Sequence, residues 1–287
     1  MVNRITAAME KARARAELRD AGSGAVSGSG PESGPATKTA TGTGAVARLP
    51  LPAVDEAWAA LPAHVPNARH LARNLIVTRE AGDAAMPFDI LRTRMLKEMR
   101  SHGWRRVAIT SPDAGCGKST LAANLALSFA RQSELRSLLL EVDLRRPSLA
   151  QLLGLTDPPP FARALAGEIA PEAALTRIGS NLAVGAGTAP VRGATEMLQH
   201  QCVGEVLERI EQRLAPAVML FDLPPLMRSD DAIAFLDKVD CALLVVEAEV
   251  TPLQDIDLSE QELARNTAVL GVVINKLQHN ERPYGYG

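Results

Sequence analysis

The chain has 287 residues with a formal net charge of −2, and 46% of its residues are hydrophobic. This near-neutral balance argues against a protein that binds nucleic-acid backbones, because such proteins carry a basic face. Its three cysteines form no CxxC pair, which favours a reducing cytoplasm over a disulfide scaffold, and no apolar stretch reaches the ~18 residues of a membrane span.

The first 85 residues are predicted to lie outside the folded domain. Residues 1–20 carry many Ala, Arg and Glu and are predicted to form a short helix with only a weak apolar stripe. Residues 21–47 consist largely of Gly, Ser, Thr, Ala and Pro, which cannot bury enough apolar surface to offset the entropy lost on ordering. We therefore expect a flexible linker over residues 21–85.

From residue 86 to residue 277, short apolar runs alternate with helical patterns. A helix is predicted over residues 88–101, and a strand over 106–110 leads through a Gly-containing loop into a helix over 118–131. Near-continuous apolar strands separated by helices predict an α/β domain with a mainly parallel sheet and helices on both faces. Ligands of such folds bind beyond the carboxyl ends of the strands. Four later apolar runs complete the predicted strands: 137–142, 218–221, 242–246 and 270–274.

The loop between the first predicted strand and its helix carries a phosphate-binding pattern. Residues 111–120 read SPDAGCGKST, which matches a P-loop except that Pro112 replaces the first Gly. Small residues let backbone N–H groups close on phosphates, Lys118 can reach the β- and γ-phosphates, and the Ser119 hydroxyl can ligate Mg²⁺. The sequence therefore predicts a P-loop NTPase fold that binds ATP and Mg²⁺. The predicted nucleotide-binding residues of the loop are Ala114, Gly115, Cys116, Gly117, Lys118, Ser119 and Thr120.

Acidic residues follow two of the predicted strands. Glu141 and Asp143 end the run SLLLEVD, and Asp222 ends VMLFD before two prolines. In an extended segment, Glu141 and Asp143 point the same way. Because Mg²⁺ prefers oxygen ligands, Asp143 and Asp222 are predicted to hold the metal together with Ser119. The predicted catalytic residues are Lys118, Glu141, Asp143 and Asp222, and either Glu141 or Asp143 would accept the proton of the attacking hydroxyl.

Both tyrosines of the chain, Tyr284 and Tyr286, lie within its last four residues. Twelve residues follow Asn275. When extended, they reach up to roughly 40 Å, which is enough to enter the active site of a neighbouring copy. We therefore expect residues 278–287 to form a tail whose tyrosine hydroxyls accept a phosphoryl group.

Together these motifs resemble the bacterial tyrosine kinases of the CpsD/CapB type, from about residue 88 to the C-terminus. The resemblance implies a protein-tyrosine autokinase that uses MgATP and phosphorylates clustered C-terminal tyrosines, usually between neighbouring subunits. It also implies that Lys118 and Ser119 are the Walker A pair, that Asp222 is the Walker B acid, and that Arg145 of the second motif binds the nucleotide. The segments that carry the resemblance are TSPDAGCGKST, LLLEVDLRRP, LFDLPP, SDDAIAFLDKVDCALLVV and GVVIN.

The same resemblance implies a regulator of exopolysaccharide or capsule polymerisation and export. Such a protein is expected in the cytoplasm, held at the inner membrane by a transmembrane polysaccharide co-polymerase of the Wzz type. A homo-oligomer and an opposing tyrosine phosphatase are further expected partners, whereas nucleic acid is not. The N-terminal arm is a candidate docking segment for the membrane partner.

The chain departs from the family pattern at several positions. Glu141 replaces the usual Asp, and the helix that closes the family's ring reads Met86, Asp89 and Arg92 where the family has one Glu and two Arg. The related partitioning and division-site ATPases carry a signature Lys where this chain has Asp113. Two alternatives therefore stay open: an ATPase switch similar to ParA and MinD, and a non-catalytic regulator of the polysaccharide machinery.

Overall fold

The computed structural model describes residues 51–277, with side chains from residue 53 onward. The predicted helix over residues 1–20, the first part of the predicted linker and the tail over residues 278–287 lie outside this part of the chain. None of the helices within residues 51–277 is long and apolar enough to cross a membrane.

An eight-stranded sheet forms the centre of the described chain, in the order β1-β4-β5-β3-β6-β2-β7-β8. All neighbouring strands are parallel except β4 and β5, which are antiparallel. The predicted mainly parallel sheet is therefore confirmed. The strands are β1 (Ala63–His64), β2 (Arg106–Thr110), β3 (Ser137–Glu141), β4 (Leu175–Ile178), β5 (Leu182–Gly185), β6 (Val218–Asp222), β7 (Cys241–Glu247) and β8 (Ala268–Asn275).

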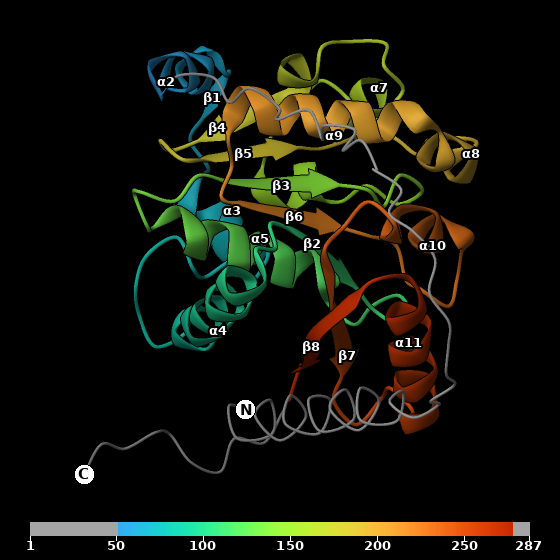
Figure 1. The fold of residues 1–287 in the computed structure, drawn as a ribbon. Coiled ribbons are helices and arrows are strands. Elements are labelled where there is room, and N and C mark those ends of the chain that lie inside the picture. The colour runs from blue at the N-terminus through green and yellow to red at the C-terminus, as the bar shows by residue number, and fades with distance from the viewer. Residues whose placement is uncertain (1–50, 278–287) are drawn as a thin grey trace, which may run out of the picture.

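Helices cover both faces of the sheet, as the sequence predicted. Figure 1 shows α4 and α5 on one side of the central strands and α9 on the other. The predicted helices over residues 88–101 and 118–131 correspond closely to α4 and α5. The helices are α2 (Leu51–Ala60), α3 (Ala68–Arg73), α4 (Met86–His102), α5 (Lys118–Ala130), α6 (Leu149–Leu153), α7 (Phe161–Leu165), the 3₁₀ helix η1 (Pro171–Ala174), α8 (Ala194–Gln199), α9 (Gln201–Leu214), α10 (Asp230–Leu236) and α11 (Leu253–Asn266).

The central strands supply side chains to two separate hydrophobic cores. In β3, Leu138 and Leu140 belong to the core beneath α2, α7 and α9, whereas Leu139 belongs to the core beneath α4 and α5. All three are fully buried. Because successive side chains of a strand point to opposite faces, only a strand covered on both sides can be apolar throughout. This is the physical reason why the near-continuous apolar runs predicted the layered fold correctly.

The predicted linker is wrong for residues 51–85, which fold onto the domain. The helix α2 packs on α9, where Trp58 is 2% exposed and its Nε1 donates to the carbonyl oxygen of Leu214 at 2.7 Å. The short strand β1 pairs with β4. After α3, the Asn124 side chain of α5 accepts from the backbone N–H of Val77 and donates to the carbonyl of Leu75. The folded unit therefore begins at least 35 residues before the predicted boundary at residue 86.

The sheet order brings the sequence motifs together. Strand β6 lies between β3 and β2, and all three are parallel. Their carboxyl ends therefore meet at one edge, where Glu141 is in register with Asp222. The phosphate loop follows β2 at the same edge. This arrangement places the motifs at the carboxyl end of the parallel strands, where ligands of such folds bind.

Candidate functional site

The phosphate loop occupies residues 111–117, between the end of β2 and the start of α5. Gly115 and Gly117 have φ angles of +90° and +86°, in the left-handed region that other residues rarely adopt. The loop delivers Lys118 as the first residue of α5, so the amino end of that helix faces the carboxyl edge of the sheet. Backbone N–H groups and a helix N-terminus of this kind favour anions such as phosphates.

Gly117 is also constrained by Asn275, the last residue of β8. The side-chain Nδ2 of Asn275 donates to the carbonyl oxygen of Cys116 at 2.9 Å, and a Cβ added at Gly117 would lie 2.4 Å from that nitrogen. Gly115 has a similar positive φ angle, but a Cβ there would meet nothing within 4 Å. Asn275 therefore ties the phosphate loop to β8 at a position where only Gly fits.

We predict that Gly117→Ala destabilises the nucleotide-free protein more than Gly115→Ala does. The left-handed backbone alone costs an Ala about 1–2 kcal/mol, and the contact with Asn275 adds about 1–3 kcal/mol at Gly117. Urea unfolding of the two variants measures the difference. In an Asn275→Ala background, Gly117→Ala should destabilise the protein by an amount closer to that of Gly115→Ala, because the side chain that the new Cβ would contact is gone. Equal destabilisation by both single variants would contradict the proposed contact.

Lys118 lies among three of the predicted site residues. Its Nζ is 2.9 Å from Asp143 Oδ2, 3.3 Å from Asp222 Oδ1 and 3.2 Å from Ser119 Oγ. Burial opposes the charge of Lys118, but the two carboxylates nevertheless raise its pKa above the ordinary value. Burial also raises the pKa of Asp222, whose side chain is fully enclosed. The structure thus brings Lys118, Ser119, Asp143 and Asp222 into one cluster.

The oxygen atoms of this cluster fit a magnesium ion that is shared with a nucleotide. Asp222 Oδ2 is buried and has no hydrogen-bond partner within residues 51–277, although buried polar atoms normally have one. No group of three His, Cys, Asp or Glu in the same residues is arranged to hold a metal ion by itself. Mg²⁺ commonly takes one or two carboxylates and completes its shell with waters and substrate phosphates. The donor set of Ser119, Asp143 and Asp222 fits that pattern.

Glu141 has different partners from Asp143, although the sequence predicted that the two side chains point the same way. Glu141 Oε1 accepts from the backbone N–H groups of Ser148 and Leu149, and its Oε2 accepts from the N–H of Gly187 at 2.7 Å. Burial raises its pKa to about 7 despite these three donors. Glu141 therefore connects the end of β3 to the segment before α6 and to the loop after β5, whereas Asp143 pairs with Lys118.

We predict that Glu141→Ala lowers the free energy of unfolding by about 2–3 kcal/mol, because backbone donors lose their acceptor while the removal of a buried charge offsets part of that loss. Urea unfolding measures the change. Glu168→Ala is the matched control, since Glu168 is exposed and pairs with the exposed Arg163 at 2.9 Å, an interaction worth under about 1 kcal/mol. Equal stability of the two variants would exclude Glu141 as a structural anchor.

Arg145 does not contact the Lys118 cluster. Its Nε is 2.5 Å from Asp231 Oδ2 and its Nη2 is 3.0 Å from Asp231 Oδ1. The Arg145 side chain is 54% exposed, whereas Asp231, at the start of α10, is fully buried. Arg145 also donates to the hydroxyl of Thr195 at 3.2 Å. The predicted contact of Arg145 with the nucleotide thus stays a prediction.

An ion pair flanks the phosphate loop at the position of the signature Lys in related ATPases. Arg228, from the loop after β6, donates its Nε to Asp113 Oδ1 at 2.7 Å, and its Nη2 contacts the other oxygen. The Arg228 guanidinium holds the pKa of Asp113 down to about 2. Sequence reasoning noticed Asp113 but missed Arg228, because 115 residues separate the partners and neither belongs to a spaced motif.

The helix α4 corresponds to the helix that closes a ring in the tyrosine kinases that this chain resembles, and two of its polar side chains contact other residues of the same chain. Asp89 contacts Ser128 Oγ at 2.5 Å and pairs with Arg131. Arg92 donates to the carbonyl oxygen of Ser128 at 2.7 Å. Met86, where the family has Glu, is 48% exposed. Asp89 and Arg92 thus fasten α4 to α5 and to Arg131, which follows it.

Comparison with known proteins identifies both the fold and a set of relatives. The family model ParA, described as NUBPL iron-transfer P-loop NTPase, matches residues 104–280. The chain is 30% identical over 200 residues to the putative tyrosine-protein kinase EpsB of Ralstonia nicotianae, which covers 69% of this chain and 26% of EpsB. It is also 30% identical over 188 residues to the tyrosine-protein kinase YwqD of Bacillus subtilis, covering 63% of this chain and 77% of YwqD.

Solved structures agree with the P-loop NTPase fold. The kinase domain of the Escherichia coli tyrosine kinase ETK superposes with a TM-score of 0.63 at 23% identity, over 72% of this chain and 81% of that domain. The cell-division ATPase MinD of Pyrococcus furiosus superposes with a TM-score of 0.52 at 26% identity, over 62% of this chain and 74% of MinD. The chain thus spans about a quarter of EpsB but most of YwqD, and its fold is shared by a tyrosine kinase domain and a cell-division ATPase.

Proposed function

This chain belongs to the bacterial tyrosine kinases and contains a P-loop NTPase domain of the ParA type, and we therefore propose that it is an ATP-dependent protein-tyrosine autokinase. The acceptors would be Tyr284 and Tyr286, and the donor would be ATP with Mg²⁺ as cofactor. The observation that carries the proposal is the placement of Lys118 Nζ between Asp143 and Asp222 at the end of the phosphate loop.

The proposed roles follow from the contacts of each side chain. Lys118, at the start of α5, would neutralise negative charge on the transferred phosphoryl group, and the loop from Ala114 to Gly117 and Thr120 would bind the phosphates. Ser119, Asp143 and Asp222 would hold Mg²⁺, which when bound supplies positive charge at the phosphates.

For the phosphoryl transfer itself, the phenol oxygen of a tail tyrosine would form the new bond to the γ-phosphorus. The bond from that phosphorus to the bridging oxygen of ATP would break, so that ADP leaves. The phenolic proton would pass to a carboxylate, because a hydroxyl with a pKa near 10 is a poor nucleophile at neutral pH. Either Asp143 or Glu141 would take this proton, since both carboxylates lie at the ends of the strands beside Lys118 and both already accept hydrogen bonds, Asp143 from Lys118 and the N–H of Arg146 and Glu141 from backbone amides.

The described end of the chain favours transfer to the C-terminal tail. Asn275 ends β8 beside the phosphate loop, where its side chain contacts Cys116, so the segment that follows starts close to the proposed active site. We propose that the tail enters the site of a neighbouring copy. Because Asp89 and Arg92 fasten α4 to α5, any oligomer of this chain would rely on contacts other than the ring motif of the family.

The names of the relatives support a role in polysaccharide production. One of them is the succinoglycan biosynthesis transport protein ExoP of Rhizobium meliloti, 32% identical over 183 residues. We propose that this chain regulates exopolysaccharide or capsule polymerisation and export from the cytoplasmic side of the inner membrane. Its partners would be a transmembrane co-polymerase and an opposing tyrosine phosphatase, and the proposed docking segment is the N-terminal arm.

An ATPase switch is the second candidate, and the fold shared with MinD favours it. In one kind of ATPase switch, the signature Lys of one subunit completes the ATP site of its partner. Asp113 argues against that kind of switch, because a carboxylate paired with Arg228 stands where the Lys would be. The two candidates differ in their product, since the switch releases inorganic phosphate and leaves the tail unmodified.

Mass spectrometry of the tail after incubation with MgATP tests the proposal. The purified chain, alone and together with a candidate co-polymerase, should gain phosphate on Tyr284 and Tyr286. ATP turnover without tail modification would support the switch. ATP binding without turnover in either condition would support a non-catalytic regulator.

A further inference from the structure

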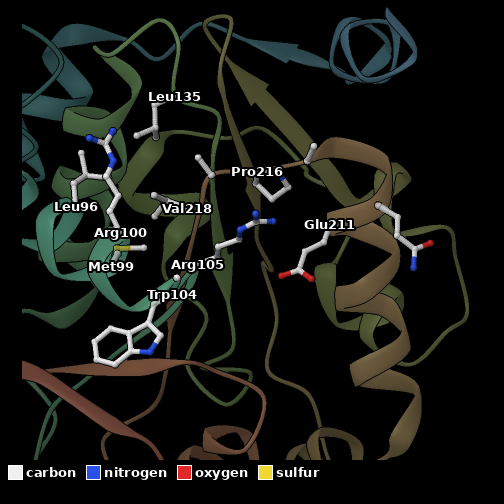
Figure 2. Close-up of a pocket in the computed structure, with 13 residues that line it drawn as sticks. Leu96, Met99, Arg100, Trp104, Arg105, Leu135, Glu211, Pro216 and Val218 are labelled. Carbon is white, nitrogen blue, oxygen red and sulfur yellow. The ribbon is translucent and has the colours of Figure 1, made fainter. Parts of the chain in front are cut away.

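A cavity of about 410 Å³ lies at the end of the sheet opposite the phosphate loop. It opens between the last turns of α4 and α9, the residues just before β2 and the start of β6 (Figure 2). A volume of this size is in the range of small-ligand sites. The larger apolar side chains that line it are Leu96, Met99, Trp104, Leu135, Pro216 and Val218.

Two arginines with free guanidinium groups also line the cavity. Neither Arg100 nor Arg105 makes an ion pair or a side-chain hydrogen bond to any other residue between 51 and 277. In Figure 2, Arg105 extends toward Pro216, and Arg100 lies on the opposite wall. The two groups therefore face the cavity from different sides.

The acidic groups near this cavity already have partners. Glu211 lines the cavity, and its two carboxylate oxygens accept from Nε and Nη2 of Arg106, each at 2.8 Å. The Asp240 carboxylate accepts from the backbone N–H groups of Arg105 and Arg106. The guanidinium groups of Arg100 and Arg105 are thus available to an anionic ligand.

An apolar cavity bordered by two guanidinium groups that are unpaired among residues 51–277 suits an anionic ligand with an apolar part, such as an aromatic ring that carries a phosphate. The ring would pack on Pro216, beside Arg105, because one face of Trp104 already stacks on His102 with the ring centroids 4.2 Å apart, and the phosphate would form charge-assisted hydrogen bonds with Arg100 and Arg105. Clusters of Arg are a recurring means of recognising phosphorylated residues. We propose that this cavity binds the phosphorylated tail, residues 278–287, of a second copy of the chain; this rests on the proposed function.

The position of the cavity favours a second copy over the same chain. The tail follows β8, an edge strand whose end contacts the phosphate loop, whereas the cavity lies at the amino end of β2. The length of β2 alone separates these two ends by about 17 Å. Residues between Leu277 and Tyr284 reach at most roughly 25 Å, and they would have to pass around the sheet. Residues 1–50 are excluded as the occupant, because they contain no Phe, Trp or Tyr.

In this proposal, the unmodified and the phosphorylated tail bind at different places on a neighbouring copy. An unmodified tyrosine would enter the catalytic site of a neighbour, and the phosphorylated product would bind at the opposite end of a sheet. Phosphorylation would then link copies head to tail, because the two surfaces involved are different. The association would be reversed when the phosphate is removed.

Binding of a synthetic peptide tests this proposal without requiring kinase activity. The peptide spans residues 278–287 with phosphate on both tyrosines, and the receptor is the full chain carrying Tyr284→Phe and Tyr286→Phe. Fluorescence anisotropy should show binding at least about tenfold tighter than for the unphosphorylated peptide. Arg100→Ala/Arg105→Ala in the receptor should remove that preference.

Two control variants show whether the peptide binds in the cavity or elsewhere on the chain. Lys97→Ala removes an exposed cation of α4 that does not line the cavity and should leave binding unchanged. Lys118→Met in the receptor should also leave it unchanged, since the catalytic site is not involved. Circular dichroism confirms that each variant is folded.

Three results would overturn the proposal: equal binding of both peptides, an intact preference in the double arginine variant, or loss of the preference in Lys118→Met. Equal binding of the two peptides would instead favour an acidic or apolar protein partner. Because the peptide is synthesised with its phosphates, this test does not depend on autophosphorylation. A failure of autophosphorylation is detected separately, by mass spectrometry of the tail.

Discussion

Lys118→Met is expected to abolish phosphotyrosine on the tail, with a loss of at least about 100-fold in the rate of transfer. The variant removes the only cation that contacts both Asp143 and Asp222 within the described residues. Without it, the phosphates would approach two carboxylates with no compensating side chain. Phosphopeptide mass spectrometry after incubation with MgATP measures the loss.

The control for this variant is Lys97→Met, which makes the same substitution at an exposed position of α4 away from the site. It should retain the wild-type signal. Lys118→Met also leaves two buried carboxylates without their partner, so circular dichroism must confirm that it is folded before activity is compared. An undiminished phosphotyrosine signal in folded Lys118→Met would remove the phosphate loop from the mechanism.

Trp58→Ala is expected to lower the free energy of unfolding by about 3–5 kcal/mol. Trp58 is 2% exposed in the core beneath α2 and α9, and its indole N–H donates to Leu214. The guanidinium carbon of Arg136 lies 5.6 Å from the centroid of the ring. A residue in a flexible linker would have none of these contacts, so its truncation would change stability by less than about 0.5 kcal/mol.

Urea unfolding measures this effect, and Trp58→Phe separates its two parts. Phe keeps an aromatic side chain in the core but loses the hydrogen bond, which leaves the carbonyl of Leu214 without this donor. We expect a loss of about 1–2 kcal/mol for Trp58→Phe, clearly less than for Trp58→Ala. Wild-type stability in Trp58→Ala would mean that α2 is not part of the cooperative unit.

The cluster around Lys118 could be predicted from the sequence because it follows from two local rules. Apolar runs identify strands, and the carboxyl ends of parallel strands meet at one edge. Asp143 and Asp222 each stand just after such a run, and the phosphate loop follows another. Neighbouring positions of β3, β6 and β2 in the sheet then bring the three segments together.

The partners of Glu141 could not be predicted in the same way. Its position after an apolar run predicted a side chain beside Asp143, but its carboxylate accepts from the backbone of Ser148, Leu149 and Gly187. Every residue except proline has a backbone N–H group, so the residue types do not indicate which of these groups a carboxylate will contact. The same holds for Arg228, whose contact with Asp113 depends on how the loop after β6 folds.

The sequence by itself determined the α/β class, the main parallel strands, the phosphate loop and the acids at the strand ends, because periodicity and short motifs are local properties. The tertiary structure alone decided that residues 51–85 belong to the domain, that Glu141 anchors two loops, and that Arg100 and Arg105 flank an apolar cavity. Each of these depends on contacts between distant segments, such as the 156 residues that separate Trp58 from Leu214. Their energies come from burial and hydrogen bonds that exist only once the sheet and its helices have assembled.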